Sequence, residues 1–178
     1  DVLVCGGWLD GLLEALLRCP TTAMVGPLSN AASFQSVPAV YSSNGQHANN
    51  KLPPGLGIDD MCKIVEDNTA REFPPATFIN GFLMMFRRVA YVNVNGFDES
   101  SFPIGYGEEN DFALRLLKAG YSLAIADNTY AYHFKTTAFS MSDRSALSRN
   151  GSMANRKKHG NDFYNLHIQY MKTHVNIM

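Results

Sequence analysis

Short apolar segments alternate with helical patterns along this chain, and the alternation is the feature that most constrains its fold. Strand-like segments occur at residues 1–4, 23–27, 77–87, 121–126 and 129–134. Helical spacing of apolar residues occurs between them, at residues 9–17, 59–69, 87–95 and 108–119. Such alternation predicts an α/β sheet flanked by helices, in which ligands bind beyond the carboxyl ends of the strands.

The size and composition predict one compact domain. A globular chain of 178 residues buries roughly 70% of the surface that its unfolded form exposes, so we expect a core that needs neither metals nor disulfides. Hydrophobic residues make up 46% of the chain, charged residues 17%, and the net charge is −1. This balance excludes a disordered chain and argues against nucleic acid as a partner.

Cysteine usage and hydropathy bear on the cellular compartment. Cys5, Cys19 and Cys62 are odd in number and have no C-x-x-C spacing, which favours free thiols over a disulfide framework or a zinc site. No apolar run approaches the ~18 residues of a membrane span, and residues 1–17 lack the basic start of a signal peptide. We therefore expect a cytoplasmic domain without a transmembrane segment.

Residues 105–115, with the sequence GYGEENDFALR, carry the densest chemistry. Acidic residues in the first turn of the helix predicted at 108–119 are stabilised by its dipole, by roughly 0.3–1 kcal/mol each. Helix capping alone is therefore one explanation for them. The glycines on either side of Tyr106 favour another, a loop that closes around a ligand and presents an aromatic ring to it.

An ordered series of motifs resembles the acceptor-side half of a family 2 glycosyltransferase with the GT-A fold, closest to the rhamnan-synthesis-like branch. The resemblance covers residues 1 to about 160. It rests on the GYGEEND segment (105–111) and on the segments that frame it, which are NGFLMMFRR (80–88), NGFDE (95–99) and AYHFK (131–135). Two further segments, GPLSN (26–30) and QSVP (35–38), are specific to the branch. We expect residues 161–178 to form a helical tail.

The resemblance implies a GT-A-like (Rossmann-like) mixed sheet flanked by helices that lacks the N-terminal nucleotide-binding half. In the family a D-x-D-type motif binds the metal that bridges the nucleotide diphosphate, and Asp1 matches its last aspartate. A missing N-terminal half, or a second copy in a homo-oligomer, would then be a partner. The expected substrates are a nucleotide-diphosphate sugar and a saccharide acceptor.

The same resemblance assigns a donor side. A divalent cation, Mn²⁺ or Mg²⁺, takes oxygen ligands with imidazole help, which fits Asp1 and His133. Lys135 is in reach of a donor phosphate as a point charge. Without the resemblance, a hydrogen-bonded structural histidine is the simpler interpretation of His133.

The resemblance also assigns an acceptor side. Inverting transfer needs one base to take the proton of the acceptor hydroxyl, and the matching position is Glu109. Most relatives have Asp there, so the longer Glu moves the carboxylate by about one methylene. Acceptor contacts are expected from Glu108, Tyr106, Gly107, Asn80 and Gly81, and support of the helix from Asp111 and Arg115.

Two other functions compete with sugar transfer. Glycoside hydrolases place two carboxylates about 5–9 Å apart across one bond, whereas adjacent Glu108 and Glu109 project about 100° apart on a helix. A carbohydrate- or partner-binding module without catalysis is the stronger alternative, because the donor half is not among these residues. In either case we expect the chain as given to be inactive by itself.

The remaining segments have weaker signals. Residues 42–57 are polar and rich in turn formers, which predicts a long loop, either disordered or a substrate-facing flap. A helix is expected at 142–149, with Asn150–Gly151 as its stop. Residues 156–159 are expected to be a solvated basic face, and residues 162–174 a terminal helix.

Overall fold

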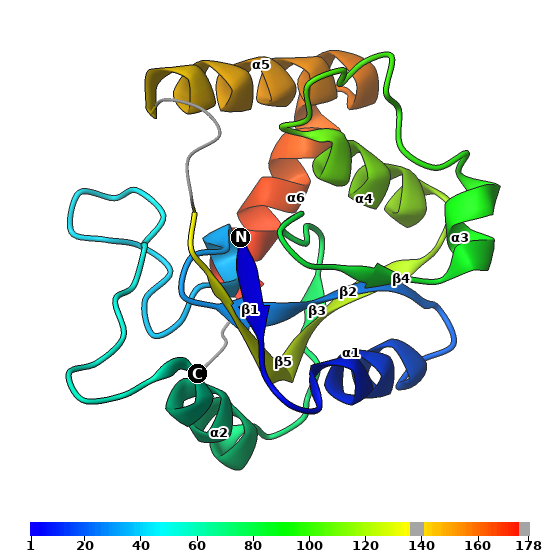
Figure 1. Cartoon of the computed structure of the whole chain (residues 1–178). Coiled ribbons are helices and arrows are strands. Elements are labelled where there is room, and N and C mark those ends of the chain that lie inside the picture. Colours follow the sequence, from blue (N-terminus) through cyan, green and yellow to red (C-terminus); the bar gives the residue numbers. More distant parts are fainter. Residues whose placement is uncertain (136–140, 175–178) are drawn as a thin grey trace.

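The computed structural model of the chain describes residues 1–135 and 141–174, and a mixed five-stranded sheet lies at its centre (Figure 1). Strand order is β1-β5-β2-β4, and β3 pairs with β5 beside this path. The strands are β1 (Val2–Val4), β2 (Thr22–Ser29), β3 (Pro75–Ala76), β4 (Met85–Phe86) and β5 (Ser122–His133).

The directions of the strands gather three chain segments at one edge of the sheet. Strands β2 and β5 are parallel, so their carboxyl ends, at Ser29 and His133, lie at the same edge. Strand β1 is antiparallel to β5, with Val2 opposite His133. Asp1 therefore lies at the carboxyl edge of the sheet, where α/β proteins bind their ligands.

Helices cover both faces of the sheet. In the view of Figure 1, α1 and α2 lie below the strands, whereas α4, α5 and α6 lie above them. The helices are α1 (Trp8–Leu17), α2 (Ile58–Asn68), α3 (Arg88–Asn93), α4 (Glu108–Lys118), α5 (Met141–His159) and α6 (Asn161–His174), with a short 3₁₀ turn at Ser33–Gln35.

Alternating side chains of the central strands supply two apolar clusters. Leu123 and Ile125 of β5 belong to the larger cluster, with Phe112 of α4 and Met171 of α6. Ala124 of β5 belongs to the smaller one, which includes Leu12 and Leu16 of α1. Successive residues of a strand point to opposite faces, and burial of each large side chain contributes about 1.5–3 kcal/mol.

The predicted α/β class and its flanking helices are confirmed, but two strand predictions were wrong. Residues 77–87 contribute only the two residues of β4, because the side-chain oxygen of Asn80 accepts a hydrogen bond from the Phe82 N–H and turns the chain. The two strands expected at 121–134 form one continuous strand, β5. Its pairing with β2 shifts register between Pro27 and Leu28, which accommodates the polar residues 127–129 without ending the strand.

The C-terminal helices also differ from the prediction. Helix α5 does not end at Asn150–Gly151 but continues to His159, and the reason is a close contact made by Gly151 that is described below. Lys157 and Lys158 are exposed, as expected of a basic face, but Lys158 and His159 also contact the buried carboxylate of Asp111. The terminal helix is confirmed as α6, whose Met171 is buried in the main core.

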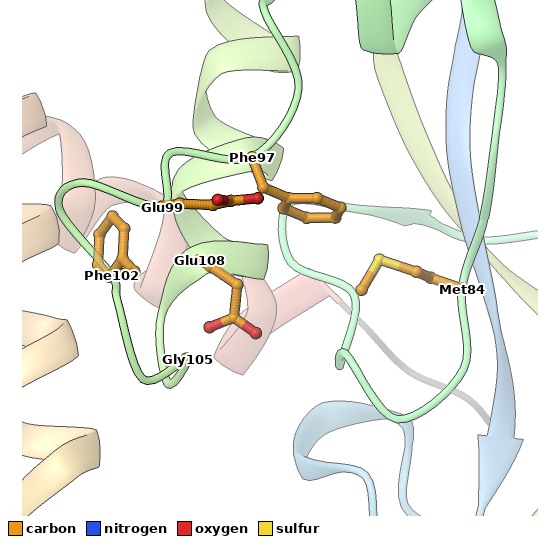
Figure 2. Close-up of a pocket in the computed structure, with 6 residues that line it drawn as sticks. All are labelled: Met84, Phe97, Glu99, Phe102, Gly105 and Glu108. Carbon is orange, nitrogen blue, oxygen red and sulfur yellow. The ribbon is translucent and has the colours of Figure 1, made fainter.

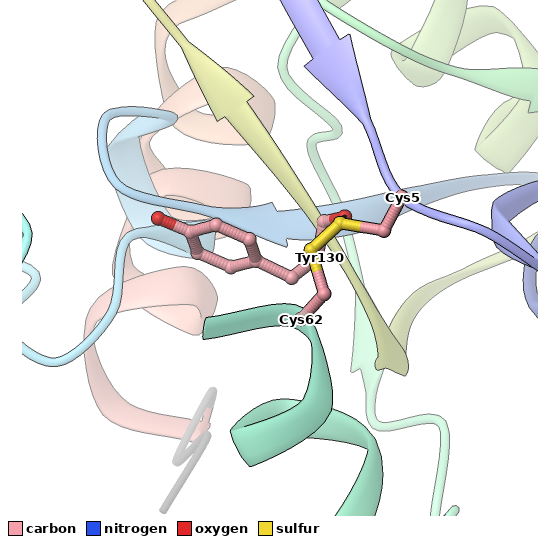
Figure 3. The surroundings of a disulfide bond; sticks show 3 residues. All are labelled: Cys5, Cys62 and Tyr130. Atoms are coloured by element: carbon pink, nitrogen blue, oxygen red, sulfur yellow. Dashed lines mark hydrogen bonds between the residues drawn. A yellow bond between two sulfur atoms is a disulfide. The ribbon is translucent and has the colours of Figure 1, made fainter. Parts of the chain in front are cut away.

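A disulfide bond corrects the prediction of free thiols. Cys5, just after β1, is bonded to Cys62 of α2, with Cα atoms 6.2 Å apart, and Tyr130 of β5 lies beside the bond (Figure 3). Cys19 is free and exposed. Spacing in the sequence could not reveal a pair that only the packing of α2 against β5 brings together. Disulfides are rare in cytosolic proteins, so the bond weighs against the expected cytoplasmic location.

Among the helices that the structure describes, none has the length and apolar character required to cross a bilayer.

Candidate active site

A tight glycine-flanked turn begins helix α4 and presents its carboxylates. Gly105, Tyr106 and Gly107 all have positive φ, at 83°, 63° and 117°. Only glycine adopts this region freely, so the two glycines allow the turn and Tyr106 is held in it by its surroundings. The Gly107 N–H donates a 3.1 Å hydrogen bond to Oε2 of Glu109, which fixes that carboxylate at the start of the helix.

Glu109 has the electrostatic character of a general base. Burial, reinforced by the nearby charge of Glu108, raises the pKa of Glu109 to about 7. The hydrogen bond from the Gly107 N–H acts in the opposite direction, by stabilising the ionised form. A carboxylate with a pKa near neutral pH binds a proton strongly and is still ionised in part of the molecules, which suits proton abstraction.

A cavity of about 290 Å³ opens beside this helix start (Figure 2). Its walls are mainly apolar, and two carboxylates interrupt them. Oε2 of Glu108 is buried and has no hydrogen-bond partner among the described residues. A buried acceptor without a donor costs about 1–3 kcal/mol or more, and a ligand hydroxyl group would satisfy it. The cavity is lined by Met84, Phe97, Glu99, Phe102, Gly105 and Glu108.

The Asn80–Gly81 turn lies against the same helix start. A Cβ atom at Gly81 would lie 3.5 Å from Cβ and Cγ of Glu109, so the side-chain face of Gly81 is turned towards this residue. The Asn80 N–H donates to Oε1 of Gln35 at 2.7 Å, and its side-chain amide donates to Oγ of Ser33 at 3.2 Å. The Asn80 side chain is therefore occupied in fixing the turn.

Asp1 and His133 meet at the carboxyl edge of the sheet. Oδ1 of Asp1 lies 3.5 Å from Nε2 of His133, and Nδ1 of His133 lies 3.1 Å from the carbonyl oxygen of Ala31. The carbonyl can only accept, so Nδ1 carries the proton, and a neutral ring then directs the lone pair of Nε2 towards Asp1. Burial lowers the pKa of His133, which favours this neutral form.

Two further contacts hold His133, one at its backbone and one at its ring. The side-chain oxygen of Asn30 accepts a 2.8 Å hydrogen bond from the backbone N–H of His133. The ring of Phe82 stacks on the His133 ring, with centroids 5.2 Å apart. Lys135 follows at φ 51°. Burial is the main cause that lowers the pKa of both His133 and His47, and the positive charge of Lys135 adds to it.

The arrangement of Asp1 and His133 fits a divalent cation only in part. A backbone carbonyl that binds Nδ1 and leaves Nε2 free is the usual orienting contact of a metal-binding histidine. Within residues 1–135 and 141–174, however, no group of three or more His, Cys, Asp or Glu side chains lies close enough to hold an ion. A cation here would need oxygen ligands from a bound substrate or water.

Asp111 and Arg115 form an ion pair inside α4. Nε of Arg115 donates to Oδ2 of Asp111 at 2.8 Å, while Lys158 and His159 each approach Oδ1 at 2.7 Å. Burial opposes ionisation of Asp111, but the hydrogen bonds from Lys158, His159 and Arg115 outweigh it and lower the pKa. The fully buried Asp111 thus links α4 to α5.

Several residues of the site gave no signal in the sequence. Phe82 stacks on His133, and Phe97 and Phe102 line the cavity, although no prediction from the sequence gave these side chains a role in the site. Asn155 lies beyond the helix predicted at 142–149 and carried no prediction, yet its side-chain amide donates to the Gly107 carbonyl oxygen at 2.9 Å. The periodicity of a sequence does not distinguish an apolar side chain in a core from one that lines a cavity.

Comparison with known families supports the class of the domain. Residues 62–137 match the family described as the N-terminal domain of galactosyltransferase. The matched segment contains the α4 turn, the Asn80–Gly81 turn and His133, but not Asp1. A search of curated proteins gave no significant match. The match and the mixed α/β sheet together support a glycosyltransferase-like domain, with a nucleotide sugar and an acceptor as its substrates.

Proposed function

We propose that the chain belongs to an inverting glycosyltransferase that moves a sugar from a nucleotide diphosphate to an acceptor hydroxyl in glycan or polysaccharide synthesis. The observation that carries the proposal is Glu109, a partly buried carboxylate with a pKa raised to about 7, next to Glu108, which lines a cavity of about 290 Å³. Its position inside the segment that matches a galactosyltransferase family supports the same reaction.

In the proposed reaction the acceptor oxygen attacks the anomeric carbon of the donor sugar. The new C–O bond forms as the bond from that carbon to the diphosphate oxygen breaks, and the electron pair leaves with the diphosphate. Glu109 takes the hydroxyl proton. One displacement inverts the anomeric centre, so a single base is sufficient.

The acceptor would bind in the cavity beside α4. The unpaired Oε2 of Glu108 accepts a hydrogen bond from a sugar hydroxyl, and Phe97 and Phe102 offer apolar surface to the C–H face of the sugar ring. Tyr106, Gly107, Asn80 and Gly81, in the two turns next to this helix start, would supply further acceptor contacts. Asp111 and Arg115 would support α4 through their ion pair.

The donor diphosphate would bind at the carboxyl edge of the sheet. Asp1 and His133 would hold Mn²⁺ or Mg²⁺, and Lys135 would pair with a phosphate oxygen. A bound cation neutralises the charge that develops on the leaving diphosphate. His133 keeps its Nε2 lone pair available for this role because Nδ1 is tied to Ala31.

We also propose that the chain belongs to family 2 of the glycosyltransferases and to its rhamnan-synthesis-like branch. The alternative function is a module that binds a carbohydrate or a partner protein without catalysis. The name of the matching family makes a nucleotide-activated galactose the first donor to test.

The deciding experiment measures transfer and binding separately. The 178-residue chain, and the same chain with any residues encoded before Asp1, are incubated with nucleotide sugars, Mn²⁺ and a panel of saccharide acceptors, and the product anomer is identified by NMR. An inverted glycoside supports the proposal. Saccharide binding without turnover in both forms would indicate a binding module, and a retained anomer would exclude the single-base mechanism.

A further inference from the structure

Helix α5 makes direct contact with the turn that begins α4. The side-chain nitrogen of Asn155 donates hydrogen bonds to the carbonyl oxygen of Gly107 at 2.9 Å and to that of Gly151 at 3.1 Å. Asn155 has no exposed surface. Its amide therefore bridges the interior of α5 and the residue at which α4 begins.

The bridged carbonyl is the one that starts α4. The oxygen of Gly107 also accepts the Asp111 N–H at 2.9 Å, the first hydrogen bond of the helix. The N–H of the same residue binds Glu109. Displacement of Gly107 would therefore move both the helix start and the carboxylate.

Gly151 permits this close approach. A Cβ atom at this position would lie 1.7 Å from the carbonyl oxygen of Tyr106, far inside van der Waals contact. Glycine inside a helix costs roughly 1 kcal/mol relative to alanine. The contact with Tyr106 accounts for a glycine in the interior of this 19-residue helix.

A third contact lies one turn further along α5. His159 donates from Nε2 to the buried Oδ1 of Asp111 at 2.7 Å. Residues 151, 155 and 159 are spaced four apart and so lie on one face of the helix. This face meets the segment 106–111 at three points, on both sides of Glu108 and Glu109.

We propose that Gly151 and Asn155 are positioning residues, which hold the Tyr106–Gly107 turn so that it keeps Glu109 bonded to the Gly107 N–H and shielded from water. The inference rests on the proposed function for the role of Glu109 as base. The conformation of the turn requires such support, because a non-glycine residue at positive φ, as at Tyr106, persists only where its surroundings enforce it.

The test follows the ionisation of Glu109 directly, in the whole chain. The carboxyl carbon of Glu109 is titrated by ¹³C NMR in the wild type, Asn155→Leu and Gly151→Ala, with Met153→Ala as the control. Met153 is 67% exposed on the same helix. Glu109→Gln identifies the signal, and thermal unfolding of every variant measures general destabilisation.

Loss of the support would admit water, which lowers the pKa of Glu109, and would weaken the Gly107 hydrogen bond, which raises it. Burial is the larger of the two causes. We therefore expect the midpoint to fall from about 7 in Asn155→Leu, by on the order of half a unit or more, and to stay unchanged in Met153→Ala. Asn155→Gln keeps the side-chain amide, so the pKa of Glu109 in this variant should lie between those in Asn155→Leu and the wild type.

An unchanged midpoint in Asn155→Leu, despite a lower thermal stability, would overturn the proposal and reduce α5 to a structural role. If Gly151→Ala does not fold, the titration of Asn155→Leu alone tests whether α5 positions the Tyr106–Gly107 turn. The result is independent of sugar transfer. If the midpoint falls but the wild type transfers no sugar, the positioning role stands and the proposed function fails.

Discussion

The ring of Phe82 stacks on the ring of His133, with centroids 5.2 Å apart and planes 15° apart. The preceding residue, Gly81, faces Glu109, whose Cβ and Cγ would lie 3.5 Å from a Cβ atom at position 81. Two consecutive residues therefore connect the edge of the sheet that carries Asp1 and His133 with the helix start that carries Glu109. A donor bound at the sheet edge and an acceptor bound at the helix start would meet next to Gly81 and Phe82.

Replacing the proposed base should separate catalysis from binding. In Glu109→Gln we expect the rate of transfer to fall by about 10²–10⁴-fold, because the amide cannot accept the hydroxyl proton. The affinity for the nucleotide sugar, measured by calorimetry, should change little. Glu66→Gln on the exposed side of α2 is the matched control, and a normal rate in Glu109→Gln would exclude Glu109 as the base.

The same substitution predicts an effect on stability with a definite sign. The pKa of Glu109 is raised from 4.5 to about 7 on folding, so the folded state binds more protons than the unfolded state between these values. The free energy of unfolding should therefore fall as the pH rises through this window, by about 3 kcal/mol in total.

Glu109→Gln removes this titration. We expect the variant to gain stability relative to the wild type between pH 5 and pH 8, as measured by urea unfolding at both values. The difference should be small at pH 5, where most of the wild-type carboxyl group is protonated in the folded state. A constant difference across this range would show that Glu109 ionises normally.

The proposed cation site predicts a selective loss of affinity. His133→Ala should weaken nucleotide binding in the presence of Mn²⁺ and leave the weaker binding without Mn²⁺ nearly unchanged, because only the cation-dependent part uses the Nε2 atom. His174→Ala, at the exposed end of α6, is the control. Equal Mn²⁺ dependence in wild type and His133→Ala would remove His133 from the site.

The disulfide predicts sensitivity to reductant. Cys5 and Cys62 are 57 residues apart in the sequence, and closing a loop of this length stabilises a fold by about 2–4 kcal/mol. Cys5→Ser should therefore lower the midpoint of thermal unfolding, and a reductant should lower that of the wild type but not of the variant. Cys19→Ser should unfold like the wild type. Mass spectrometry of the alkylated protein would show directly whether Cys5 and Cys62 are paired.

Much of the secondary structure follows from local rules, and the sequence determined it. Apolar spacing and a glycine stop predicted α4, and the same reasoning located α1, α2 and α6 within a few residues. The acidic helix start between two glycines was also recognisable, because positive φ and negative charge at a helix start are local properties.

Long-range contacts decided what the sequence could not. Asn150–Gly151 has the local signature of a helix end, yet α5 continues through it because Gly151 fits against Tyr106. Cys5 and Cys62 pair only because α2 packs on β5. The raised pKa of Glu109 depends on burial by segments distant in the chain, so only the tertiary structure provides the low-polarity surroundings that set it.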